Sequence, residues 1–356
     1  MTNPLAVDTP SAEALKYPWD TPPAPGTVRE VAAGVFWVRM PLPFALDHIN
    51  LWLLADGDGW TLVDCGICND QTMGLWRSLL AENDARPIKR IIVTHFHPDH
   101  LGLAGWLQSE TGAPLWMTQA EWSKGSLLYS DTVGRYSDLQ VEMFRVNGLQ
   151  QARLNTMSRG GNRYRELISR PPSDFQVITD GEDIEVGEHY WRVIVGTGHA
   201  PEHACLYCAD LGVLISGDQV LPKITPNISL SASEADANPL QQYLDSLQRF
   251  SGLPKNTLVL PSHGFPFYGL ELRLQQILEH HHERIEVLYD ACKEPQTAAE
   301  LMSVMFKREL DEHQIMFAMG ECLSHLAYLK HKNRLTCEAD GNGIVRYRQC
   351  CKNQSA

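Results

Sequence analysis

Three histidines and one aspartate fall within six consecutive positions, residues 95–100, in the order HFHPDH. Imidazole and carboxylate groups together suit borderline divalent metals such as zinc, iron or manganese. The cluster directly follows the apolar, β-branched run 91–93, which is typical of a buried strand. A turn just after a strand can bring together side chains that a straight strand would send to opposite faces. We therefore expect a metal site where this strand ends and a helix begins.

One such cluster cannot surround two metal ions, and the chain offers further ligands. Three more short apolar runs, each predicted to be a strand, lead into His199, Asp218 and His263. Each of these three residues has a glycine beside it in the chain. A single histidine in a polar loop is more often solvated than bound to a metal. Four strand ends that each deliver histidine or aspartate instead predict one centre, assembled where the strands end.

This set of motifs resembles the metallo-β-lactamase superfamily, in its glyoxalase II-like branch rather than among the true β-lactamases. The resemblance covers residues 28–266 and includes LVDCG at 62–66, which is similar to the family's first strand-end motif. It implies an α/β fold, a four-layer αββα sandwich with the metal site at one edge of the two sheets. The family usually shows GHTPGH around the fourth ligand, whereas this chain has GHAPEH at 198–203. That departure keeps the ligand but leaves the subfamily and the substrate open.

The resemblance also implies how the ligands divide between two divalent ions, with zinc expected first and iron or manganese as alternatives. The implied ligands are His95, His97 and His199 for the first ion, Asp99, His100 and His263 for the second, and Asp218 as a bridge. Asp64 and His203 are expected behind the ligands, where Asp64 would orient them. Asp99 and Asp218 are the expected catalytic residues, with Asp99 accepting or relaying a proton.

A site of this kind predicts hydrolysis. Two ions sharing a solvent molecule would supply a bridging hydroxide near neutral pH, and metal charge would stabilise the developing oxyanion. The chain shows no Gly-x-Ser-x-Gly nucleophile motif. By resemblance, the expected substrates are thioesters of the acyl-glutathione or acyl-CoA type, then lactones and other esters. The alternatives are an endoribonuclease or phosphodiesterase of the same superfamily, and an iron-dependent redox enzyme.

Composition restricts the possible partners and the compartment. At 356 residues the chain exceeds one ordinary core, which favours two domains. The net charge of -13 argues against a nucleic-acid surface. No apolar run approaches a bilayer-spanning length, and the N-terminus lacks the features of a signal peptide. Nine scattered cysteines favour reduced thiols and a cytoplasmic location, although the C-x-x-C pairs at 65–68 and 205–208 leave a structural zinc site as an alternative.

Three segments are expected along the chain. Residues 1–27, rich in proline and alanine, are predicted to form an extended arm, followed by the catalytic domain over 28–266. Residues 267–356 are predicted to form three helices and a hairpin, which resembles the winged-helix tail of some superfamily members. Because this tail has a nearly balanced charge, we expect it to pack on the catalytic domain or to form a homodimer rather than to read DNA. Its histidines 280–282 are expected on a solvated helix face.

Residues 119–174 are predicted to be a mainly helical insertion that acts as a lid. Several cations lie at its end, in an otherwise acidic chain, and a lysine follows Asp218. The candidate substrate-binding residues are Arg159, Arg163, Tyr164, Arg165, Arg170, Lys223 and Asn227. Guanidinium groups bind carboxylate or phosphate well, so we expect a small anionic thioester or ester as substrate. A solvated loop with local salt bridges is the alternative for these arginines.

Overall fold

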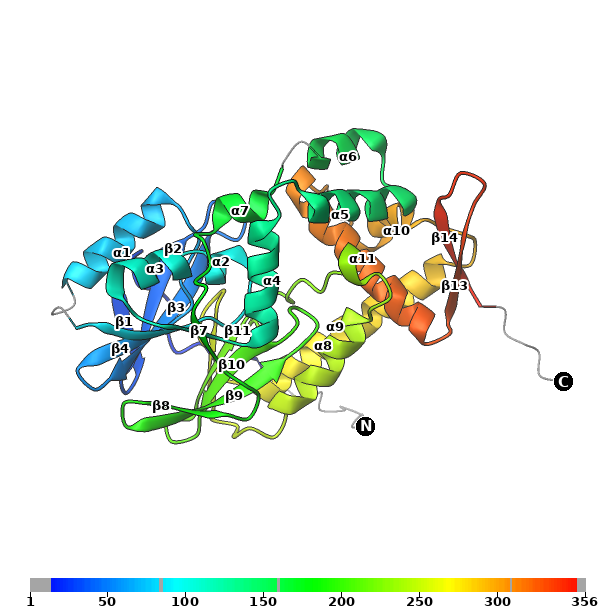
Figure 1. Ribbon diagram of the computed structural model, residues 1–356. Coiled ribbons are helices and arrows are strands. Elements are labelled where there is room, and N and C mark those ends of the chain that lie inside the picture. Colours follow the sequence, from blue (N-terminus) through cyan, green and yellow to red (C-terminus); the bar gives the residue numbers. More distant parts are fainter. Residues whose placement is uncertain (1–13, 83–85, 159–160, 308, 351–356) are drawn as a thin grey trace, which may run out of the picture.

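The computed structural model describes residues 14–82, 86–158, 161–307 and 309–350, and Arg159 therefore lies outside the described residues. Two β-sheets pack face to face, with helices on their outer faces and a group of helices and a hairpin at one end (Figure 1). In the described part of the chain, no helix is both long and apolar enough to cross a membrane.

The first sheet has seven strands that follow one another in chain order. They are β1 Val28–Ala32, β2 Val35–Pro41, β3 His48–Asp56, β4 Gly59–Val63, β5 Ile88–Ile92, β6 Leu115–Met117 and β7 Phe175–Val177. Neighbours pair antiparallel from β1 to β4 and parallel from β4 to β7. Because β4 and β5 are parallel, their carboxyl ends meet at one edge of the sheet, and Asp64 and the HFHPDH motif follow there.

The second sheet has five strands in the order β12-β11-β10-β9-β8. They are β8 Asp183–Val186, β9 His189–Gly196, β10 His203–Cys208, β11 Val213–Gly217 and β12 Leu258–Pro261. The pairing is antiparallel except between β11 and β12. The strands β9, β11 and β12 therefore run in the same direction, and their carboxyl ends lead to His199, Asp218 and His263 at one edge.

Apolar alternation along the strands builds the layers. On β3, Trp52 and Leu54 face the second sheet, in a core shared with Val193 and Leu206. Leu51 and Leu53 alternate with them and face the other way. The outer face of the first sheet packs on helices α1 Asp70–Glu82, α2 Pro98–Leu101 and α3 Ala104–Thr111. The predicted αββα sandwich is confirmed.

The outer face of the second sheet packs on α8 and on the C-terminal segment. These elements are η1 Ala232–Glu234, α8 Pro239–Leu247, η2 Gln248–Phe250, α9 Leu270–Ala291, α10 Ala298–Met305, α11 Glu312–His331, β13 Leu335–Ala339 and β14 Val345–Gln349. One continuous core joins Leu214 and Val259 of the sheet to Ile277 of α9 and Met319 of α11. The three helices and the hairpin thus pack on the catalytic part and do not stand apart from it.

The residues predicted to form an insertion contain four helices between β6 and β7. They are α4 Gln119–Ser130, α5 Arg135–Val146, α6 Gln151–Ser158 and α7 Arg163–Leu167. Figure 1 shows α4 upright at the side of the sheets that faces the C-terminal helices, α7 near its upper end, and α5 and α6 beside α10 and α11. The insertion therefore reaches from the edge of the sheets to the C-terminal helices.

The expectation that residues 280–282 lie on a solvated helix face is wrong for the middle one. His281 is fully buried, and its Nδ1 lies 3.2 Å from Nε2 of the buried His325 on α11. It shares the buried side of α9 with Ile277 and Ile285, four residues away on either side. The helical spacing, rather than the run of three histidines, decides its position.

Candidate metal centre and the cavity beside it

The predicted ligands lie just beyond the carboxyl ends of four strands. β5 is followed by His95, His97, Asp99 and His100, β9 by His199, β11 by Asp218 and β12 by His263. Their donor atoms form two groups, and within each group the atoms lie within 4.8 Å of one another. The fold therefore brings together side chains that are up to 168 residues apart, from 95 to 263.

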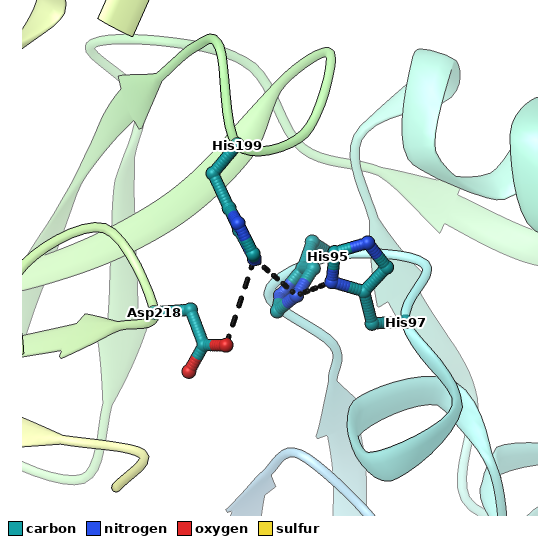
Figure 2. Close-up of side chains that lie close together, drawn as sticks. All are labelled: His95, His97, His199 and Asp218. Carbon is teal, nitrogen blue, oxygen red and sulfur yellow. Dashed lines mark hydrogen bonds and ion pairs between the residues drawn. The ribbon is translucent and has the colours of Figure 1, made fainter. Parts of the chain in front are cut away.

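The first group consists of His95, His97, His199 and Asp218 (Figure 2). His95 Nε2 lies 2.8 Å from His97 Nδ1 and 3.2 Å from His199 Nε2. His199 Nε2 lies 3.5 Å from Asp218 Oδ2. Ligand nitrogens at about 2.0–2.1 Å from a tetrahedral zinc ion are about 3.3 Å from one another. These spacings fit donors arranged around one ion.

The second group consists of Asp99, His100 and His263, and Asp218 also reaches it. His263 Nε2 lies 3.4 Å from Asp99 Oδ2 and 3.3 Å from Asp218 Oδ1. His100 Nε2 lies 3.7 Å from Asp99 Oδ2 and 3.6 Å from Asp218 Oδ1. The two oxygens of Asp218 thus face different groups, Oδ2 toward the first and Oδ1 toward the second.

Two buried polar atoms test whether these residues fit a metal. His100 Nε2 and Asp218 Oδ1 are buried and have no hydrogen-bond partner among the described residues. Buried polar atoms are nearly always paired, because an unpaired one costs free energy. Both atoms point into the second group, where a cation would pair with both. The donor set and its geometry therefore fit two divalent ions with Asp218 between them.

Neighbouring groups fix the orientation of the ligand imidazoles. His199 Nδ1 donates to the carbonyl oxygen of Asn227 at 2.8 Å, and His263 Nδ1 donates to that of His48 at 2.8 Å. His100 Nδ1 donates to Asp64 Oδ2 at 2.7 Å. In all three imidazoles Nε2 is left to face the site, and a metal would bind it there once the ring is neutral.

Asp64 and His203 lie behind the ligands. Asp64 Oδ1 accepts a hydrogen bond from the Thr94 backbone N–H at 2.8 Å, and its backbone is left-handed, with φ of 62°. His203 is buried, and its Nε2 accepts a hydrogen bond from the backbone N–H of Asp218 at 3.0 Å. A Cβ at Gly217 would lie 2.3 Å from the His203 ring, so only glycine fits beside it. These contacts hold the loops of His100 and Asp218 in place.

The charge state differs between the two groups. Burial and the neighbouring imidazoles lower the pKa of His97 to about 3 and that of His95 well below its usual value, so both are neutral and able to bind a metal. In the second group burial opposes protonation of His263, but Asp218 and Asp99 outweigh it and raise its pKa to about 10. A cation bound there would displace protons, because a ligand imidazole must be neutral.

Glu121, on the insertion helix α4, is a buried residue that the sequence did not reveal. Its Oε2 accepts a hydrogen bond from the Phe96 N–H at 2.9 Å, between the ligands His95 and His97. Its Oε1 accepts another from the Glu202 N–H at 2.6 Å, in the loop after His199. One carboxylate therefore connects two ligand loops from different sheets.

We expect Glu121→Gln to lower both metal affinity and turnover by about 10- to 100-fold, the usual cost of losing a group that positions a ligand loop. The amide nitrogen of glutamine would face one of the two backbone N–H donors, which it cannot accept. Metal titration and steady-state kinetics measure the two effects. Glu110→Gln, at an exposed position of α3, is the matched control. Wild-type affinity in the Glu121 variant would show that this link does not position the ligands.

A cavity of about 430 Å³ opens beside His97 and His199. It lies between the insertion, the segment 227–233 and the start of α11. The residues that line it include Phe96, Lys124, Leu128, Tyr136, Gln140, Val141, Phe144, Met157, Arg163, Tyr164, Asn227, Ser229, Glu312 and Met316. Its size is that of a small-molecule site.

The predicted substrate-binding residues divide into two sets. Arg163, Tyr164 and Asn227 line the cavity. Arg165 instead stacks over the Tyr129 ring, 4.5 Å from its centroid, and donates to the Tyr129 carbonyl oxygen at 2.9 Å. Arg170 and Lys223 are exposed, and neither lies among the residues that line the cavity. Lys124, which the sequence did not suggest, lines the cavity and lies 3.4 Å from Glu234.

Comparison with known families agrees with this geometry. The family model described as the metallo-beta-lactamase superfamily matches residues 45–263, which is more than half of the chain. The chain belongs to this superfamily. A second model, described as the metallo-beta-lactamase-like C-terminal domain, matches residues 285–350.

Two of three similar proteins cover most of this superfamily member. A beta-lactamase domain protein from Burkholderia ambifaria, of known crystal structure, is 42% identical, with a TM-score of 0.88 over 94% of this chain and 98% of that one. The probable metallo-hydrolase YqjP of Bacillus subtilis is 25% identical over 87% of this chain and 96% of its own length. The acyl-coenzyme A thioesterase MBLAC2 of Gallus gallus is 25% identical over 68% and 82%, respectively. The protein is a metallo-hydrolase of the superfamily.

Proposed function

We propose that the protein is a binuclear metal-dependent hydrolase of thioesters or related carboxylic esters, with zinc as the first candidate metal. The observation that carries the proposal is Asp218, whose two oxygens face two separate ligand groups. His95, His97 and His199 would hold one ion with Asp218, and the remaining three ligands would hold the other. Ions bound there supply a Lewis acid and lower the pKa of water.

The residues around the centre have separate tasks. His97 and His199 border the cavity, so a carbonyl group bound there lies beside the first ligand group. Asp99 belongs to the second group and faces His263 Nε2 with its Oδ2. We propose that its other oxygen accepts the proton of the attacking water and passes it to the leaving group. The thioester class is supported by the largely apolar cavity and by the similarity to an acyl-coenzyme A thioesterase.

A panel of one thioester, one lactone and one phosphodiester tests the proposal, with the protein loaded in turn with zinc and with iron. We expect the thioester to have a kcat/KM at least about tenfold above the other two, which is a difference of about 1.4 kcal/mol in transition-state binding. A faster phosphodiester would point to the nuclease class. An iron-dependent oxygen reaction without hydrolysis would point to a redox enzyme.

Arg163 is the arginine best placed to hold an anionic part of the substrate. It lines the cavity, and in the described part of the chain its guanidinium group has no carboxylate partner. We expect Arg163→Gln to raise KM about tenfold for a charged thioester, since a charge-assisted contact contributes about 1.5–3 kcal/mol, and to change KM less for a neutral one. Arg165→Gln, which removes the cation stacked on Tyr129, is the control. If KM for the charged thioester is the same in the Arg163 variant as in the wild type, Arg163 does not have this role.

A further inference from the structure

The cavity has one apolar wall, and it comes from elements outside the two sheets. Val141 and Phe144 of α5 face it, together with Met157 of α6 and Met316 of α11. Residues 136, 137, 140, 141 and 144 of α5 all line it, which is the spacing of a single helix face. The insertion and the C-terminal helix therefore build this wall together.

A second part of the lining is polar and is connected to the metal centre; it also packs on α5, because the Ala232 N–H donates to Gln140 Oε1 at 3.1 Å. Ser229, Ser231 and Ser233 line the cavity at alternate positions of one segment. This segment is hydrogen-bonded to α11, because the Leu230 N–H donates to the Gly320 carbonyl oxygen at 3.1 Å. It begins at Asn227, whose carbonyl oxygen accepts the Nδ1 hydrogen bond of His199. The C-terminal helix thus contacts the loop that orients a predicted metal ligand.

The cavity's charges do not favour a polyanion. Lys124 and Arg163 are offset by Asp131 and Glu312, which also line it. The apolar wall, by contrast, offers methionine, valine and phenylalanine side chains, and methionine adapts its shape to a flexible ligand. A ligand with an apolar chain and a polar group near His97 and His199 matches both parts of the lining.

We propose that this cavity binds the acyl chain of the substrate, a straight chain of medium length, and that Met316 makes the C-terminal helix part of the substrate site. This inference rests on the proposed thioesterase function, which supplies the acyl group. The chain would lie along the wall of α5, α6 and α11, with its carbonyl carbon beside His97 and His199.

The test compares butyryl and octanoyl thioesters of N-acetylcysteamine. Each buried methylene is worth about fourfold in binding, so the four additional methylenes of octanoyl would contribute about 250-fold if all were fully buried. We expect wild-type kcat/KM to be at least about thirtyfold higher for octanoyl, which corresponds to burial of roughly two to three of them. Met316→Trp and Val141→Trp fill the apolar wall, and they are expected to lower the octanoyl value about tenfold or more while changing the butyryl value less than about threefold. Leu139→Trp, at a position of α5 that is 52% exposed, is the matched control and is expected to have no effect.

Calorimetric binding of octanoate gives a second readout that does not need turnover. We expect wild type and Leu139→Trp to bind it, and the two cavity-filling variants to bind it at least about tenfold more weakly. If thioesters are hydrolysed but chain length has no effect and the three tryptophan variants behave alike, the cavity is not the acyl site. If no thioester is hydrolysed, the proposed function fails. Octanoate binding then tests the cavity independently of turnover. The inference is overturned if octanoate does not bind, or if it binds equally well to the wild type and to the cavity-filling variants.

Discussion

Asp218→Ala is expected to lower hydrolysis by at least about a thousandfold, a loss of about 4 kcal/mol in transition-state stabilisation. The carboxylate reaches His199 through Oδ2 at 3.5 Å and His263 through Oδ1 at 3.3 Å, so alanine removes a ligand from both groups at once. Its backbone N–H would still donate to His203, which should preserve the loop.

Steady-state turnover and metal content are measured together for this variant, and circular dichroism checks the fold. Asp210→Ala, an exposed aspartate between β10 and β11, is the control and should keep wild-type turnover. Near wild-type turnover in the Asp218 variant would reject the shared role of this carboxylate.

Metal removal by a chelator is expected to abolish hydrolysis and to lower Tm by about 5 °C or more. An ion present at about a thousand times its Kd stabilises the folded state by about 4 kcal/mol, and each kcal/mol changes Tm by about 2 °C in a chain of this size. Without an ion, His100 Nε2 and Asp218 Oδ1 make no hydrogen bond among the described residues and face each other only as an ion pair at 3.6 Å.

Calorimetry and activity are followed before dialysis, after dialysis against a chelator, and after zinc is added back. Recovery of both Tm and turnover on re-addition is the expected result. Dialysis against buffer alone is the control. Full activity in protein with less than about 0.1 equivalents of metal would show that the reaction needs no metal.

The ligand residues could be predicted because their signal is local. Each lies within a few residues of an apolar strand end, and parallel pairing of β4 with β5 and of β11 with β12 brings these ends together. The αββα expectation comes from the resemblance to the superfamily, and the strand-rich halves with helices between their strands, which are visible in short windows of sequence, fit it.

Contacts between distant elements could not be predicted in this way. Glu121 connects two ligand loops, and His48 accepts from His263, because the packing of whole helices and strands brings them there. The positions of the arginines could not be predicted either. Arg163 and Arg165 are two residues apart, yet one lines the cavity and the other stacks on Tyr129. A one-dimensional cluster of charge does not specify which side of a short helix each guanidinium occupies.

The burial of His281 is predicted by the helical spacing of its neighbours, although the run of three histidines favours solvent exposure. His281 lies four residues after Ile277 and four before Ile285, which is the spacing of a buried helix face. A run of three histidines indicates solvent exposure, but helical periodicity separates its members, and only His282 of the three is exposed.

Metal counting on protein purified without chelator tests the central claim most directly, because two ligand groups that share Asp218 predict two ions per chain. Mass-spectrometric analysis, with protein concentration determined independently, should give about two equivalents of metal in the active enzyme. Asp218→Ala should give clearly fewer under the same purification. A reproducible value near one equivalent, with full hydrolytic activity, would contradict the binuclear centre.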